Sequence, residues 1–499
     1  MKPERTNRPR FAPAAWTVLA LAMLASGCAS YQGIEPQSTL RTPESLGLGK
    51  AAGTVASGLA AEAAPVNAEW WHAFGDAGLD RLIAQALKDS PSLKVAQARI
   101  ARARAAVEAA HAAELPQVSG ELDLQRQRYT ENGLFPPPIA GSMRNSATLQ
   151  ANGSWELDFF GKHRQALDAA LGTTRAAEAD ADAARVLLAS NIARAYIQLA
   201  RLHDQLQVAE RTLAQRQASH GLVRDRFNAG LDTALELRQS EGSLPEARQQ
   251  IEAVAEQIEL TRHAIAALVA DPQAAVEAKP LAALKPVPVA GPLPADLLGR
   301  RADVAAARWR VEAATHDIRS AKADFYPNIN IAGFIGLSSL GVGKLLEPGS
   351  LQWGVGPAIH LPIFDAGRLR AGLRGKTADL DIAIETYNST VIDAVKDAAD
   401  QLASLRSIAR QQKEEADALS SAEAAYDIAL QRYRAGLGTY LNVLTAESSV
   451  LQQRRLSVDL AGRALDAQVQ LMRALGGGWQ PDARTAQLES NESSKKEQP

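Results

Sequence analysis

The sequence predicts a mainly helical protein that also carries a membrane β-barrel, and three observations support this fold class. The chain is internally duplicated. The evidence is that residues 226–241 (RFNAGLDTALELRQSE) and 432–447 (RYRAGLGTYLNVLTAE) align at an offset of about 206 residues. Four short segments alternate between apolar and other side chains, and each pair of them is followed by a very long helical pattern. The repeat is too long for a solenoid, so it indicates a duplicated half protein.

The duplication sets the expected domain organisation. The first half covers residues 69–290 and the second half covers residues 291–478. Each half is expected to hold a strand pair, a long helix and a return helix. The mid-chain stretch 271–294, rich in Pro and Ala, joins the halves. The tail 479–499 is polar and is expected to be disordered.

The N-terminus has the pattern of an exported lipoprotein. Basic residues precede an apolar run at 16–25, which is typical of a secretory signal and too short to span a membrane. The run ends in LASGC, which resembles a lipoprotein processing site with Ala25 where that pattern prefers Leu. Residues 1–27 are therefore predicted to be a signal peptide, and Cys28, the only cysteine, is predicted to be lipidated. Residues 28–68 are expected to be a linker.

Each half opens with helical segments. In the first half, an amphipathic segment at 69–87 precedes a helix expected from Ser92 to about Glu114, and Pro91 separates the two. The second half restarts at Leu297 with LLGRRADVAAARWRV, and this helix is expected to end at the segment FYP.

The four alternating segments are predicted to be membrane strands at about 117–127, 147–158, 328–337 and 351–362. Each has about the 9–11 residues of a tilted transmembrane strand, with one face for lipid and one for water. Two ordinary hairpins packed on a helical core are the alternative. Two observations argue against this alternative. The polar faces of the segments consist of small and charged residues, and the long helices are expected to pack against each other. The loops 128–145 and 338–350 have the Gly and Pro content of exposed loops.

Long helices of about 66 residues, or ~100 Å, are expected at about 162–228 and 367–433. Return helices are expected at about 232–270 and 438–475. The second long helix carries a seam with alternating steps of four and three, which indicates closely paired helices. The seam consists of Val391, Val395, Ala398, Leu402, Leu405, Ala409, Gln412, Ala416, Leu419, Glu423, Tyr426, Leu430 and Tyr433.

Both copies of the A-G-L segment lie where a long helix ends and a return helix begins. A glycine in the left-handed region terminates a helix, and a following Asp or Thr can cap the next one. Asp232 and Thr233 are the expected caps in the first copy, and Thr439 is the expected cap in the second. Each segment is therefore predicted to be a hairpin tip. A plain helix–helix turn without function is the alternative, and two matched copies weigh against it.

The sequence carries no recognisable catalytic or metal-binding signature. The eight histidines never fall at i,i+3 or i,i+4 spacing, and the GVGK segment at 341–344 lacks the spacing of a P-loop. No serine elbow or thiol nucleophile is present. A net charge of −2 argues against a nucleic-acid surface. An enzyme is not expected, and no metal or cofactor is predicted besides the covalent lipid on Cys28.

Four antiparallel strands cannot close a transmembrane barrel, and an open sheet edge is not tolerated in lipid. Copies of the chain must therefore associate. Two chains would give eight strands and a barrel filled by its own side chains, whereas three would give twelve strands around a wet lumen.

These features together resemble the outer-membrane efflux factor family of the TolC type, and within it the OprM/NodT-type lipoprotein branch. The resemblance runs from Cys28 to about Leu475. It is carried by AEWWHAFGDAGLDRLIAQAL, WELDFFGKHR, LLGRRADVAAA, FYPNI, LPIFDAGRLR and RYRAGLGTYLNVL. Ala302 stands where the family usually has Pro in an R-R-P-D-V run, which indicates a softer helix start.

The resemblance implies a homotrimer whose twelve strands form one barrel, continued by an α-helical tube in the periplasm. It implies a lipid-anchored exit duct in the outer membrane that passes drugs or toxic compounds from an inner-membrane pump, expected to be of the RND type, by way of a periplasmic membrane-fusion adaptor. A non-channel periplasmic lipoprotein scaffold built on a long coiled coil is the alternative. The sequence names neither the cargo nor the pump and adaptor.

The resemblance also places two functional regions on the tips. Adaptor docking is expected at Gly230, Leu231, Thr233, Gly436, Leu437 and Thr439. Some family members carry an acidic ring six and nine residues after the second Gly, where this chain has Asn442 and Thr445. Any charge at a periplasmic aperture would then come from Glu236 or Glu447. The aperture candidates are Glu236, Tyr440, Asn442, Thr445 and Glu447.

Overall fold

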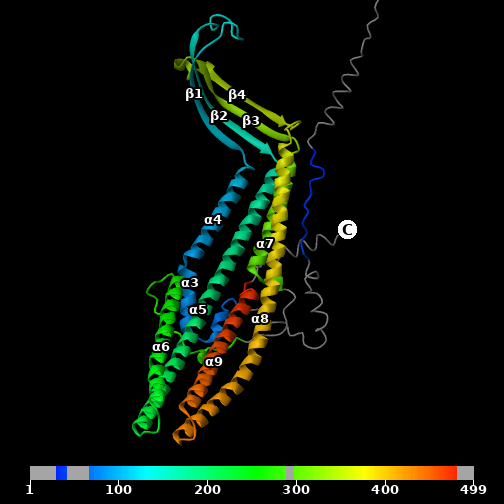
Figure 1. Cartoon of the computed structure of the whole chain (residues 1–499). Helices are drawn as coiled ribbons and strands as arrows, with labels where there is room; N and C mark the ends of the chain where they lie inside the picture. Colours follow the sequence, from blue (N-terminus) through cyan, green and yellow to red (C-terminus); the bar gives the residue numbers. More distant parts are fainter. Residues whose placement is uncertain (1–29, 42–66, 288–296, 480–499) are drawn as a thin grey trace, which may run out of the picture. The chain divides into compact units, whose positions relative to one another are not determined.

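The computed structural model describes residues 30–41, 67–287 and 297–479 (Figure 1). The predicted signal peptide and Cys28 lie outside these residues. The chain divides into two compact units, which are described separately below. Among the described residues, the first comprises 30–40, 100–176 and 307–387, and the second comprises 41, 67–99, 177–287, 297–306 and 388–479.

The first unit contains a four-stranded antiparallel sheet in which the strands lie in chain order (Figure 1). Its strands are β1 (Gln117–Arg128), β2 (Met143–Leu157), β3 (Asn328–Leu340) and β4 (Leu351–His360). β2 begins earlier than the predicted 147–158, because residues from Met143 onward pair with the end of β1, where Arg128 faces Met143. β3 likewise extends to Leu340, which pairs with Ser146.

The strand register gives the sheet one apolar face and one polar face. A row of four leucines crosses all strands, because Leu149 faces both Leu122 and Leu337, and Leu337 also faces Leu351. On the opposite face the adjacent row consists of Glu121, Gln150, Gly336 and Gln352. The apolar row is exposed at Leu122, Leu149 and Leu351, which is the arrangement that strict alternation predicts.

Two helices of equal length lead into the strand pairs, α4 (Pro91–Ala112) and α7 (Ala302–Ala323). Pro91, expected to separate two segments, is itself the first residue of α4, a position where proline loses no helical hydrogen bond. Near the sheet, α7 packs closely on the long helix α5 (Lys162–Asn228), because a Cβ on Gly172 would lie 3.1 Å from that of Ala313.

Residues 30–40, expected to be linker, are part of the first unit and pack within it. Ile34 is buried in a cluster with Phe325 and with residues of the second long helix, α8 (Arg368–Arg434). The backbone N–H groups of Gln37 and Ser38 both donate to the Asp381 carboxylate at 2.9 Å. This segment therefore has fixed contacts, since buried apolar area and satisfied backbone donors hold it in place.

The core of the second unit forms around the amphipathic segment predicted at 69–87. That segment is divided into a 3₁₀ turn η2 (Trp70–Phe74) and helix α3 (Ala77–Asp89). Gly75 adopts a positive φ of 69° between them, and Asp76 caps α3. The hydroxyl of Tyr196 on α5 donates to Asp76 at 2.8 Å. Further 3₁₀ turns are η3 (Leu281–Ala283), η4 (Leu297–Arg300), η5 (Val342–Lys344) and η6 (Pro348–Ser350).

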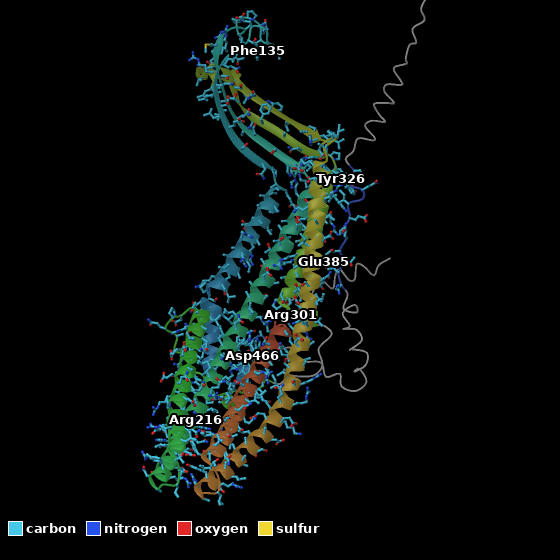
Figure 2. The ribbon with its side chains drawn as sticks, viewed as in Figure 1. Phe135, Arg216, Arg301, Tyr326, Glu385 and Asp466 are labelled. Carbon is cyan, nitrogen blue, oxygen red and sulfur yellow. The ribbon has the colours of Figure 1, made fainter. Side chains whose placement is uncertain are left out.

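In the second unit, the long helices α5 and α8 each continue into a hairpin with a return helix, α6 (Ala234–Val269) or α9 (Tyr440–Ala474) (Figure 1). Ion pairs join α5 to α9. Asp466, which is labelled in Figure 2, lies 2.7 Å from Arg194, and Asp459 lies 3.3 Å from Arg201. These contacts link one hairpin to the other.

Equivalent elements of the two halves are separated by one number of residues in the hairpins and by another number in the helices before the strands. α5 and α8 both have 67 residues and begin 206 positions apart, at 162 and 368. α4 and α7 both have 22 residues and begin 211 positions apart, at 91 and 302. The offset falls by five residues across the strand pairs, largely because the loop 129–142 is four residues longer than the loop 341–350.

The heptad seam predicted on α8 is wrong at two positions. Ala409 and Ala416 are exposed, whereas Ile408 and Glu415 are buried. Ile408 packs with Leu460 and Ala467 of α9. The deviation is local, because contact with α9 buries Ile408 in place of Ala409, whereas the predicted Tyr426 and Tyr433 further along α8 are buried. Among the described residues, no helix combines the length and the apolar character needed to cross a membrane.

Candidate functional site at the hairpin tips

Both hairpin tips end their long helix in the same way. Gly230 and Gly436 adopt φ values of 76° and 75°, which residues with a side chain adopt only at a cost. The next N–H reaches back to the helix, from Leu231 to the Arg226 carbonyl at 2.9 Å and from Leu437 to that of Arg432 at 2.8 Å. This is the Schellman termination, so the glycines act as helix caps.

Each tip also projects two leucines into solvent. Leu231 and Leu437, predicted for adaptor docking, are 66% and 69% exposed. Leu235 and Leu441 lie one turn further on and are 63% and 62% exposed. We call these four leucines the tip leucines. No role was predicted for Leu235 and Leu441, although both copies of the repeat carry Leu at this position.

The predicted caps of the return helices behave differently in the two copies. The Thr233 hydroxyl accepts from the Leu235 N–H, and the Glu236 carboxylate accepts from the Thr233 N–H at 3.0 Å, which completes a capping box. Hydrogen bonding from Thr233 lowers the pKa of Glu236 below its ordinary value. Thr439 occupies the equivalent position without a side-chain cap bond. The first tip is therefore the better capped.

Asp232, expected to be a cap, instead connects the two hairpins. Its carboxylate accepts from Arg226 at 3.1 Å and from the hydroxyl of Tyr433, a residue of α8. The Arg226 guanidinium lies 4.7 Å from the centre of the Tyr433 ring. We call Arg226, Asp232 and Tyr433 the tip link. Burial and the Asp232 hydrogen bond raise the pKa of the Tyr433 phenol.

The tip link was not predicted, although the two copies of the repeat differ at its residues. Gly438 stands at the position equivalent to Asp232, and Phe227 stands at the position equivalent to Tyr433. The two copies therefore differ at the residues that link the two hairpins. The first tip supplies the carboxylate of Asp232, and the second hairpin supplies the hydroxyl donor of Tyr433.

The five aperture candidates fall into exposed and buried positions. Asn442 and Thr445 are exposed on α9, and the Thr445 hydroxyl donates to the Leu441 carbonyl at 3.0 Å. Glu236 is partly exposed in its capping box. Tyr440 is buried against Tyr433, with ring centres 5.7 Å apart, and burial raises its pKa to about 12.

Glu447, proposed as a source of aperture charge, is buried between helices of the two hairpins. Its carboxylate lies 3.4 Å from Arg216 of α5, which is labelled in Figure 2. Arg216 also donates to the Ser243 carbonyl of α6 at 2.9 Å. Burial raises the pKa of Glu447 above its ordinary value despite this cation. In the folded chain, Glu447 is therefore a packing and pairing residue.

The described residues contain no group of three or more His, Cys, Asp or Glu side chains placed to hold a metal ion. What the tips present is an apolar surface on a capped turn, together with a polar link between hairpins. The exposed apolar surface favours contact with another macromolecule, and the polar link restrains the two hairpins relative to each other.

The fold described above is shared with outer membrane channels of solved structure. A sequence model of the outer membrane efflux protein family matches residues 82–271 and 293–477, one match in each half. The chain belongs to this family. Its members and the similar solved structures are outer membrane channels and not enzymes.

Individual relatives agree with this assignment. The putative multidrug resistance outer membrane protein MdtQ of Escherichia coli K12 is 32% identical over 487 residues, covering 95% of this chain and 99% of MdtQ. The fusaric acid resistance protein FusA of Burkholderia cepacia is 38% identical and covers 73% of this chain and 69% of FusA. The crystal structure of the outer membrane protein VceC of Vibrio cholerae is similar to this chain, with a TM-score of 0.78 and 34% identity. The match covers 83% of this chain and 100% of VceC.

Proposed function

We propose that this protein is the outer-membrane exit duct of a tripartite efflux system. Three copies would share one barrel of twelve strands, and their hairpins would form a helical tube in the periplasm. The duct would receive drugs or other toxic compounds from an inner-membrane pump of the RND type through a membrane-fusion adaptor. The names of MdtQ and FusA, which refer to multidrug and fusaric acid resistance, support this class of cargo.

The observation that carries the proposal is the two-faced sheet with free edges. Its apolar face exposes the leucine row, and its other face is polar. Within the described residues, β1 and β4 each pair with one strand only. In hydrocarbon the unpaired backbone groups of those edges would cost several kcal/mol each. Further copies of the chain can supply the missing partners and close the barrel.

Purification of the full chain from outer membranes in detergent tests this proposal. We expect a trimer that resists heating and that forms ion-conducting pores in planar bilayers. A protein that leaves the membrane as a compact monomer and forms no pores would contradict the duct and favour the periplasmic scaffold.

We also propose that Cys28 carries the lipid anchor. The contacts of Gln37 and Ser38 with Asp381 support it, because they hold the chain soon after the predicted anchor against the unit that bears the sheet. A Cys28→Ser variant of a duct should still insert through its barrel, although without lipid. Complete release of this variant into the soluble periplasmic fraction would instead support the scaffold.

We assign adaptor docking to the tips, with the tip leucines as its apolar surface. The glycine caps support this, because a residue without a side chain lets a foreign backbone approach closely. Gly436→Trp should abolish efflux and adaptor crosslinking. Gly375→Trp, at an exposed glycine near the other end of α8, is the matched control. Intact efflux and crosslinking in Gly436→Trp would show that the adaptor docks elsewhere.

A further inference from the structure

One aromatic residue lies on the face of the sheet where polar residues dominate. The strands contain three aromatic residues, and the register places Trp155 and Trp353 on the apolar face. Phe334 lies on the other face, because it is aligned with Asn152 on one side and with Gly354 on the other. Its side chain is 40% exposed, so the ring remains accessible to solvent.

The surroundings of Phe334 leave room for a ligand. A Cβ built on Gly354 would lie only 2.9 Å from the Phe334 ring, so the ring occupies the space that a side chain at position 354 would need. Around it the sheet has a shallow, open hollow of about 610 Å³. The polar-face residues that line this hollow include Gln117, Ser119, Asn152, Ser154 and Gly356.

The charge of this face favours cations. Glu121 and Asp123 project from β1 on the same face, and Glu121 accepts from the amide of Asn152 at 3.1 Å. Asn152 in turn is the register partner of Phe334. Among the strand residues of this face, Arg144 is the only Lys or Arg, and it lies at the loop end of β2. A cation stacked on the Phe334 ring would interact with the ring face and, across β2, with the negative charge of Glu121.

We propose that Phe334 and the carboxylate of Glu121 form a contact site for planar aromatic cations inside the barrel. The site rests on the proposed function, in which the polar face lines the lumen. Three copies would place three such rings around one passage. A cation would stack on the ring and gain from the nearby carboxylate, and the exposed site would allow it to leave again.

A purely structural role for Phe334 is the competing explanation, since an aromatic side chain opposite a glycine stabilises a sheet. The two explanations differ in what a substitution changes. Loss of a structural residue lowers the melting temperature of the trimer. Loss of a contact site lowers the affinity for a cation in a pore that still conducts.

The test is block of the ion current by ethidium, measured with the full chain in planar bilayers. We expect ethidium to block the wild-type pore, and Phe334→Ser to weaken the block about three- to tenfold. Glu121→Gln should weaken it in the same direction, and Phe334→Tyr should retain it. Trp353→Ser is the matched control, because Trp353 is 71% exposed on the opposite face and should not affect the block.

Each outcome decides between the explanations. A wild-type protein without pores contradicts the proposed function itself. Pores that ethidium does not block, or that it blocks equally in Phe334→Ser, overturn the contact site and leave the duct intact. If Phe334→Ser fails to assemble, Phe334→Ile keeps an apolar strand former at this position and replaces it in the test. Unchanged block in that variant overturns the site equally.

Discussion

At the scale of single residues, the tip link joins the two hairpins through few atoms. Tyr433→Phe removes the phenol hydroxyl that donates to Asp232 while keeping the ring under Arg226. One such hydrogen bond contributes about 1 kcal/mol, so the population of separated tips should rise about fivefold. In planar bilayers we expect more frequent or larger open events. Tyr426→Phe, in the same buried cluster, is the control. Identical conductance in both variants would mean that the link does not restrain the tips.

A second prediction concerns how the buried Glu447 makes the stability of the fold depend on pH. Its pKa is raised by burial, so the folded state binds this proton more tightly than the unfolded state does. Stability from this group is therefore present at low pH and is lost as pH rises from the ordinary glutamate value of 4.5 through the raised pKa. Glu447→Gln should remove that loss. Thermal unfolding and hydrogen exchange of α9 between pH 4 and 8, in about half-unit steps, would measure it.

Glu236 provides a control of opposite sign. Its pKa is lowered by the hydrogen bond from Thr233, so its stabilising contribution is present above the ordinary value of 4.5 and is lost as pH falls through the lowered pKa. Glu236→Gln should therefore lower stability above about pH 4.5 and remove the loss on the acid side of the profile. If both variants shifted the profile in the same direction, the burial assigned to Glu447 would be wrong.

At the scale of elements, the two return helices begin with the same residue type in different roles. Thr233 caps α6 through its side chain, whereas Thr439 makes no side-chain cap bond at the start of α9. Thr233→Ala should cost about 1 kcal/mol of local stability, and Thr439→Ala should cost much less. Hydrogen exchange at the first turn of each helix measures this directly. Equal acceleration in both helices would show that the threonines cap alike.

The long helices and the strands were predictable because their signals are periodic and local. The first long helix was expected at about 162–228 and is α5 (Lys162–Asn228). The strand ends were less predictable, since β2 begins at Met143 only because β1 continues to Arg128. The roles of Asp232 and Glu447 were not predictable, because they depend on partners in the other half of the chain, Tyr433 and Arg216.

At the scale of the whole molecule, the proposed assembly requires the apolar face to meet lipid. Leu149 and Gln150 are neighbours on β2 that face opposite sides of the sheet. Leu149→Arg should destabilise the inserted trimer by about 2–4 kcal/mol if this row lies near the bilayer midplane. Gln150→Arg, on the wet face, should be tolerated. The measurement is the yield and heat resistance of trimer from outer membranes. Equal losses in both variants would contradict the lipid-facing assignment.

The sequence by itself determined the duplication, the helix and strand types and the glycine caps, because each follows from periodicity or from backbone preferences within one segment. The tertiary structure decided which side chains meet across the halves. It placed Glu447 in a buried pair, turned Asp232 from a cap into a link and put Phe334 beside Asn152. The physical reason is that burial, charge pairing and strand register depend on residues some 200 positions away, whose approach no local pattern specifies.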